Sequence, residues 1–143
     1  MDQKTTRELE EVLKNTKDAD MLEDYLEELP TLQPYETFRE YYKDIIKDKE
    51  LDNTDLIQKS GIERTYYYQL MNGTRSPGRD KILLLCITAG FTLKETQRAL
   101  EIANAGTLYS KNRRDAILIF CIERKLNMID TNELLDQFGE SLL

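Results

Sequence analysis

Residues 56–73 of this 143-residue chain read LIQKSGIERTYYYQLMNG, and this stretch decides the fold. Gly61 suits the left-handed conformation that ends a helix, and Asn72-Gly73 stops a second helix. Between them, an apolar residue would hold a tight turn to the core, and polar residues would begin the second helix. This spacing predicts a helix-turn-helix. The residues that would hold its two helices together are Leu56, Ile62, Tyr67 and Leu70.

The polar residues of the second helix suit contacts with double-stranded DNA in the major groove. Arginine pairs well with guanine and glutamine with adenine, while basic and small polar side chains around such a helix hold phosphates. The base-contact candidates are Arg64, Thr65, Tyr66 and Gln69. The phosphate-contact candidates are Lys59, Asn72, Thr74, Arg75, Ser76 and Arg79. Two alternatives stay open: Arg64 touches only phosphate, and Tyr66 and Tyr68 only cover the flanks of the helix.

Outside this stretch, the apolar spacing predicts an all-α chain of about eight short helices. Thr92 and Glu95 form a capping box for a helix over residues 93–104. Thr131 is expected to cap a last helix over residues 132–138. Residues 116–122 are apolar all round, so a buried strand competes with a helix there. We favour a helix because no other segment offers a strand partner.

Two prolines, Pro30 and Pro34, mark the clearest boundary in the chain. The predicted parts are an acidic helical arm (1–33), a helix-turn-helix domain (34–105) and a C-terminal helical extension packed on it (106–143). Charge is unevenly distributed along the chain. Residues 61–125 hold 11 basic and 6 acidic side chains, whereas residues 1–60 hold 9 basic and 17 acidic side chains. Residues 61–125 form either a basic binding surface or an ordinary solvated surface with uneven charge.

Composition narrows the classes of function. The chain has 20 Lys and Arg against 27 Asp and Glu, a net charge of −7, which excludes a uniformly basic nucleic-acid binder but not a local basic face. It has no His, and its two Cys are too few for a disulfide framework or a thiolate zinc site. We therefore expect no enzyme, no metal and no cofactor. Without a membrane-spanning segment or signal peptide, a cytoplasmic location is expected.

From Tyr35 to about Leu93, the chain resembles the lambda-repressor-like, Xre-type family of DNA-binding domains. The resemblance rests on residues 56–73, on Arg75-x-Pro77, and on residues 89–93, AGFTL. It implies a DNA-binding transcriptional regulator, in general a two-fold dimer. It also implies a phosphate contact at Asn53, where the family usually has Gln. Residues 108–116 resemble an extension found in some bacterial members of the family.

Three further expectations concern partners. A protein–protein interaction module that has lost DNA binding is the alternative function, supported by the net negative charge and the acidic arm. The arm is expected to dock on the C-terminal helices near a basic cluster or to compete with DNA. The basic cluster consists of Lys111, Arg113 and Arg114. It is expected either to pair with the acidic arm or to make an additional phosphate contact. The candidates for a homodimer contact are Leu134, Leu135, Phe138, Leu142 and Leu143.

Overall fold

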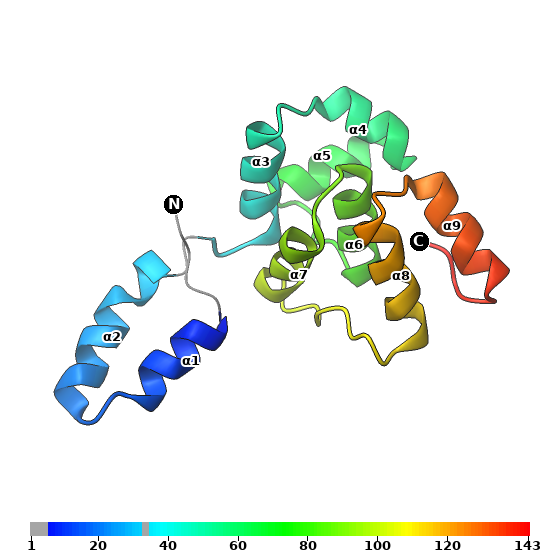
Figure 1. The fold of residues 1–143 in the computed structure, drawn as a ribbon. Coiled ribbons are helices and arrows are strands. Elements are labelled where there is room, and N and C mark those ends of the chain that lie inside the picture. Colours follow the sequence, from blue (N-terminus) through cyan, green and yellow to red (C-terminus); the bar gives the residue numbers. More distant parts are fainter. Residues whose placement is uncertain (1–5, 33–34) are drawn as a thin grey trace. The chain divides into compact units, whose positions relative to one another are not determined.

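The computed structural model describes residues 6–32 and 35–143, and every regular element in them is an α-helix (Figure 1). The chain divides into two compact units, residues 1–36 and 37–143. The first unit holds α1 (Thr6–Lys14) and α2 (Ala19–Leu32). The second holds α3 (Phe38–Asp48), α4 (Asn53–Ser60), α5 (Arg64–Asn72), α6 (Arg79–Thr88), α7 (Leu93–Ile102), α8 (Arg113–Glu123) and α9 (Met128–Gln137). The all-α prediction is confirmed.

The first unit is a pair of short amphipathic helices. The N–H of Met21 donates to the carboxylate of Asp18 at 2.8 Å, which satisfies a free donor at the start of α2. Helix α2 continues through Pro30, the first of the two prolines that mark the predicted boundary, to Leu32. A proline removes one backbone hydrogen bond and can kink a helix without ending it. Residues 33 and 34 of the predicted linker lie outside the described residues.

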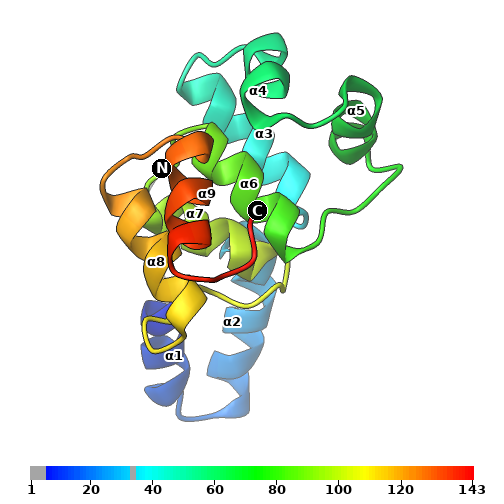
Figure 2. The same ribbon diagram turned by 90° about the vertical axis from the view of Figure 1, so that its right-hand side faces the viewer.

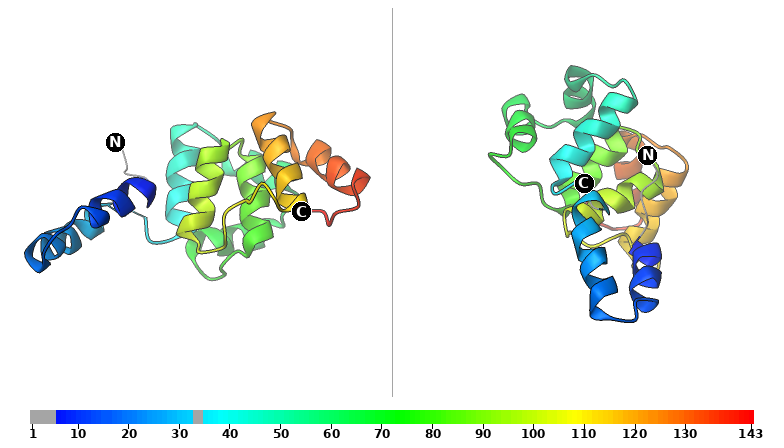
Figure 3. Two further views of the ribbon diagram at one scale, coloured as in Figure 1. Left: turned by 60° about the horizontal axis from the view of Figure 1, so that its bottom comes forward. Right: turned by 90° about the vertical axis from the view of Figure 1, so that its left-hand side faces the viewer.

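Helix α6 is the centre of the second unit. Its residues 82–87 are all buried, because α6 packs against α4, α7 and α9. Helix α3 lies along α7 and also contacts α5 (Figure 3). Cys86 of α6 and Cys121 of α8 are both free thiols and fully buried, and burial raises the pKa of each. Both cysteines therefore belong to the core of the second unit.

The predicted C-terminal extension packs on the rest of the second unit, with α8 against α7 and α9 against α6. Residues 116–122 lie in α8, so the helix that we favoured over a strand is confirmed. The predicted start of the last helix is wrong. Asn127 caps α9 by accepting from the N–H of Asp130 at 2.8 Å, and Thr131 is buried inside the helix. None of the helices in residues 6–32 and 35–143 has the length and apolar character to cross a membrane.

Candidate nucleic-acid interface

The turn between α4 and α5 has the geometry that the sequence predicts. Gly61 has φ +71°, and its N–H donates to the carbonyl oxygen of Ile57 at 3.2 Å. The hydroxyl of Ser60 donates to the same carbonyl oxygen at 3.0 Å and accepts from the N–H of Ile62 at 3.2 Å. Ile62 is buried. Because the turn is bonded on both sides and anchored in the core, the direction of α5 is fixed.

Helix α5 has a buried side and an exposed side. Tyr67, Leu70 and Met71 are buried. Burial of Tyr67 and Leu70 agrees with a place in the core, whereas their predicted role in joining the two helices stays a prediction. Figure 2 shows α5 at the edge of the second unit, followed by the loop that leads to α6. The predicted base-contact residues are all accessible. Arg64 and Thr65 are exposed, and Tyr66 and Gln69 are half-buried.

Two basic side chains from different elements lie near the ring of Tyr66. The guanidinium carbon of Arg75 is 5.8 Å from the ring centroid, and the amine of Lys81 is 5.9 Å from it. A cation over an aromatic ring is held by the ring's electron density, so both charges stay beside α5. Lys81 is absent from our sequence-based candidates. It follows Arg79 by two residues, which places the two side chains on different sides of α6.

Arg64 also lies over an aromatic ring. Its guanidinium carbon is 5.6 Å from the ring centroid of Tyr68, a side chain that is 38% exposed. Among the residues that the structure describes, no carboxylate forms an ion pair with Arg64, Arg75 or Lys81. Their hydrogen-bond donors therefore remain available to a partner outside the chain.

The hydroxyls of Tyr42 on α3 and Tyr67 on α5 form a pair on the buried side of α5. The Tyr67 hydroxyl donates to the Asn53 carbonyl oxygen at 2.8 Å and lies 3.2 Å from the Tyr42 hydroxyl. Burial raises the pKa of both tyrosines, so both hydroxyls keep their protons. Asn53 does not cap α4, because Asp52 occupies the N-cap position. One end of the Asn53 amide is thus committed to Tyr67, and only its nitrogen can reach a phosphate.

The loop after α5 is held by its own side chains. Asn72 accepts from both the N–H and the hydroxyl of Thr74, at 2.9 and 2.6 Å. Gly73 has φ +85°, and a Cβ atom there would lie 2.7 Å from the guanidinium carbon of Arg39. A side chain at position 73 would therefore be strained and would displace Arg39. The phosphate-contact candidates of this loop are exposed: Thr74, Arg75 and Ser76.

Arg79 does not take the place expected for a phosphate contact. Its guanidinium forms two bonds with the carboxylate of Asp115, at 3.1 and 2.9 Å, and two more with the carbonyl oxygens of Gly106 and Thr107. Burial by itself would raise the pKa of Asp115, but the bonds from Arg79 and from the N–H of Tyr109 bring it below its usual value. Arg79 therefore fastens the segment before α8 to α6, which corrects the prediction.

Two other predicted basic sites are partly or wholly occupied. Lys59 forms an exposed ion pair with Asp55 at 2.9 Å. Arg113 pairs with Glu140 at 3.1 Å and also donates to the carbonyl oxygen of Phe138. Arg114 bonds Asp80 at 2.8 and 3.2 Å and donates to the carbonyl oxygens of Ser141 and Leu142. These two arginines hold the C-terminal segment. Of this cluster, Lys111 is exposed and has no bond of this kind in the described part of the chain.

Comparison of the chain with protein-family models, with curated proteins and with solved structures finds no match in any of the three.

Proposed function

We propose that this chain binds double-stranded DNA in a sequence-specific manner and acts as a transcriptional regulator, in the simplest case a repressor. The α4–turn–α5 unit serves as a helix-turn-helix of the lambda-repressor type, with α5 in the major groove. Arg64 reads guanine and Gln69 reads adenine, with Thr65 and Tyr66 beside them. The residues that hold phosphates are Asn53, Asn72, Thr74, Arg75, Ser76 and Lys81.

One observation carries this proposal. The cations around α5 lie over tyrosine rings and have no carboxylate partner among the described residues, although the chain carries a net charge of −7. In an acidic chain, unpaired arginines beside an exposed polar helix indicate a surface for an anionic partner. The rings limit the freedom of Arg64 and Arg75 before any partner arrives, so less side-chain entropy is lost on binding.

The direct experiment is selection of bound sequences from random double-stranded DNA. We expect enrichment of one motif, and an affinity for that motif that falls as salt concentration rises, because phosphate contacts release counterions. Absence of any enriched motif, together with binding that does not respond to salt, would contradict the proposal.

A pair of variants tests the role of Arg64. Arg64→Ala should weaken binding to the selected motif by about 1–3 kcal/mol and relax preference at one base pair if Arg64 reads a base. Arg124→Ala is the matched control, because Arg124 also lies over a ring, 3.6 Å from the centroid of Phe120, but directly after α8 and not near α5. Uniform weakening on every sequence would assign Arg64 to phosphate, and equal effects of both variants would remove α5 from the interface.

A homodimer on two half-sites is part of the proposal, because one reading helix covers only a few base pairs. Of the apolar C-terminal candidates, Leu135 is fully buried and is therefore excluded from the contact. Phe138 and Leu142 are 46% and 49% exposed and remain candidates. Light scattering with and without the selected DNA tests this part, and a monomer mass at all concentrations in both conditions would contradict it.

The second candidate function is a protein–protein interaction module. It is favoured by the carboxylate pairs of Lys59 and Arg79, which remove two expected phosphate contacts. Exposed apolar side chains of α1 and α2 would then contact a protein partner: Val12, Leu13, Met21, Leu22 and Leu26. Failure of the DNA selection would favour this second function.

A further inference from the structure

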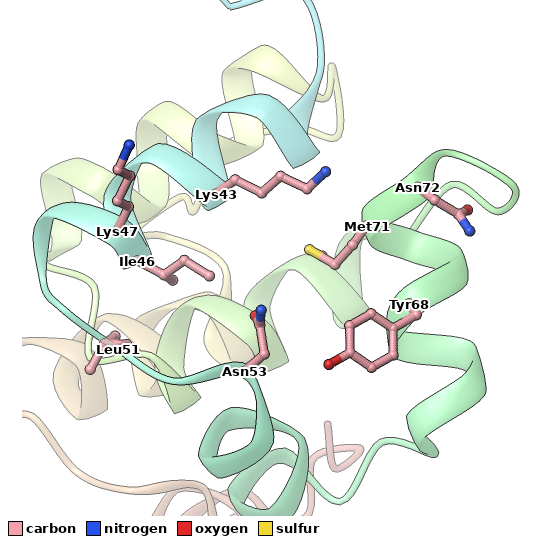
Figure 4. A pocket seen from close by; sticks show the side chains of 8 residues that line it. All are labelled: Lys43, Ile46, Lys47, Leu51, Asn53, Tyr68, Met71 and Asn72. Carbon is pink, nitrogen blue, oxygen red and sulfur yellow. The ribbon is translucent and has the colours of Figure 1, made fainter.

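Helices α3 and α5 and the start of α4 surround a hollow of about 510 Å³ (Figure 4). This volume falls within the range of about 300–1,000 Å³ that is common for small-molecule sites. Ile46, Leu51 and Met71 give the hollow an apolar lining. In Figure 4 the thioether of Met71 and the side chain of Ile46 point toward each other across it. An occupant would therefore gain by burying an apolar body there.

The polar groups of the hollow are nearly all hydrogen-bond donors. The carbonyl oxygen of Asn53 already accepts from Tyr67 at 2.8 Å, so only its amide nitrogen is left to face the hollow. The carbonyl oxygen of Asn72 is likewise taken by Thr74. The hydroxyl of Tyr68 can donate as well as accept. Orientation of both amides is set by bonds outside the hollow, so the donors are in place before any ligand binds.

Two lysines complete the lining. Lys43 and Lys47 lie one turn apart on α3, and both line the hollow. Neither forms an ion pair with a carboxylate among residues 6–32 and 35–143. In Figure 4 the side chains of Lys43 and Asn53 reach over the apolar lining, whereas the Lys47 amine and the Asn72 side chain point away from it. An amine and an amide donor above apolar side chains suit an anion with an apolar body.

We propose that this hollow binds a small amphipathic carboxylate, with an aromatic or branched aliphatic body against Ile46, Leu51 and Met71. The carboxylate accepts from Lys43 and from the amide nitrogen of Asn53. A carboxylate fits better than a neutral polar group because nearly every polar group of the lining offers hydrogens. The apolar lining favours such a ligand over a bare inorganic anion.

The ligand would also touch α5, because Tyr68 and Asn72 line the hollow. Arg64 lies over the ring of Tyr68. A ligand against that ring would change the position of Arg64 and hence the affinity for DNA. This regulatory step rests on the proposed function, whereas ligand binding itself does not, and it is tested without DNA.

The experiment measures binding of 2-naphthoate to the full chain by titration calorimetry and by chemical shifts of ¹⁵N-labelled protein. We expect 2-naphthoate to bind at least about tenfold tighter than the neutral 2-naphthalenemethanol and than acetate. The largest shifts should fall on residues 43–53 and 68–72. Equal affinities for the acid and the alcohol, or shifts confined to other helices, would overturn the proposal. Equal binding of dimethyl phosphate would also overturn it and assign the hollow to a DNA backbone phosphate.

Two variants test the donor groups. Lys43→Gln should weaken 2-naphthoate binding about threefold to tenfold, because its charge is exposed and partly screened. Asn53→Asp keeps an acceptor for Tyr67 but places a carboxylate oxygen in the hollow, and it should abolish binding. Lys94→Gln, on the exposed side of α7, is the matched control and should bind as the unaltered chain does. Unchanged affinity in both test variants would overturn the proposal, and far-UV circular dichroism confirms that each variant is folded.

Discussion

The arginines around α5 and those between α6 and α8 differ in what they contact. Arg64 and Arg75 lie over tyrosine rings at 5.6 and 5.8 Å. Arg79 and Arg114 each form two bonds with one carboxylate and further bonds with backbone carbonyl oxygens. The second pair has few donors left for a partner. Basic residues that are close in sequence can therefore have different roles. Those bonded to carboxylates and carbonyl oxygens hold the fold, whereas those over aromatic rings keep their donors for a partner.

Removal of the carboxylate of Asp115 should have the largest effect. Asp115→Ala leaves Arg79 partly buried without its partner and removes the acceptor for the N–H of Tyr109. We expect the free energy of unfolding to fall by about 2–4 kcal/mol, less than for a fully buried pair because Arg79 is partly exposed. Urea denaturation measures it. DNA affinity of the folded variant should change little, and a strong loss would show that Arg79 or Asp115 belongs to the interface.

Acidic pH should remove the contribution that the Asp115 carboxylate makes to the free energy of unfolding. The pKa of Asp115 is lower in the folded chain than in the unfolded chain, where an aspartate titrates at about 3.9. The unfolded chain therefore takes up the proton first as the pH falls. The stability that Asp115 contributes is complete above about pH 5 and is lost as the pH falls through the folded value.

Urea denaturation of the unaltered chain and of Asp115→Asn between pH 6 and pH 2.5 measures this loss. The difference between the two proteins should shrink in acid. Glu95, whose pKa is also lowered, is present in both and cancels in the difference. A difference that stays constant over this range would contradict the prediction.

On the α5 side, Arg75→Gln should affect binding and not folding. We expect DNA affinity to fall about threefold to tenfold on every sequence, with the salt dependence reduced by about one counterion. The free energy of unfolding should stay within about 0.5 kcal/mol of the original value, because Arg75 is exposed and forms no ion pair in the described residues. Lys94→Gln serves as the control for the loss of one exposed charge.

The smallest effect is expected at Lys59, which stands between the two kinds of basic residue. Its ion pair with Asp55 is exposed on both sides, so Lys59→Gln should change the free energy of unfolding by less than about 0.5 kcal/mol. If Lys59 also meets phosphate, its loss should reduce DNA affinity less than Arg75→Gln does, because Asp55 already neutralises it. A larger loss than at Arg75 would reverse the assignment of the two residues.

Local signals in the sequence predict much of the fold. The turn at Gly61, the stop at Gly73 and the capping box of Thr92 and Glu95 are all confirmed, since each depends on residues within a few positions. Thr131 fails as a cap because Asn127 offers the same chemistry four residues earlier. Threonine suits both a cap and a buried site, so its local sequence does not distinguish them.

The candidate site depends more on contacts distant in sequence. Arg79 and Asp115 are 36 residues apart, and no local pattern indicates that they meet. The place of Lys81 beside Tyr66 follows from the angle at which α6 leaves the loop, which the sequence does not show. The composition of the site, arginines and tyrosines near the turn, was therefore predictable, whereas the division of the basic residues between the two roles was not.

The buried thiols of Cys86 and Cys121 make local opening of the second unit measurable by chemistry. Only a thiolate reacts with a disulfide reagent, and burial here both covers the sulfur and raises the pKa of the thiol. Modification therefore requires the surrounding helices to separate. Cys86 lies in α6 and Cys121 in α8. The order in which the two are labelled shows whether α8 and α9 detach before the centre of the unit opens.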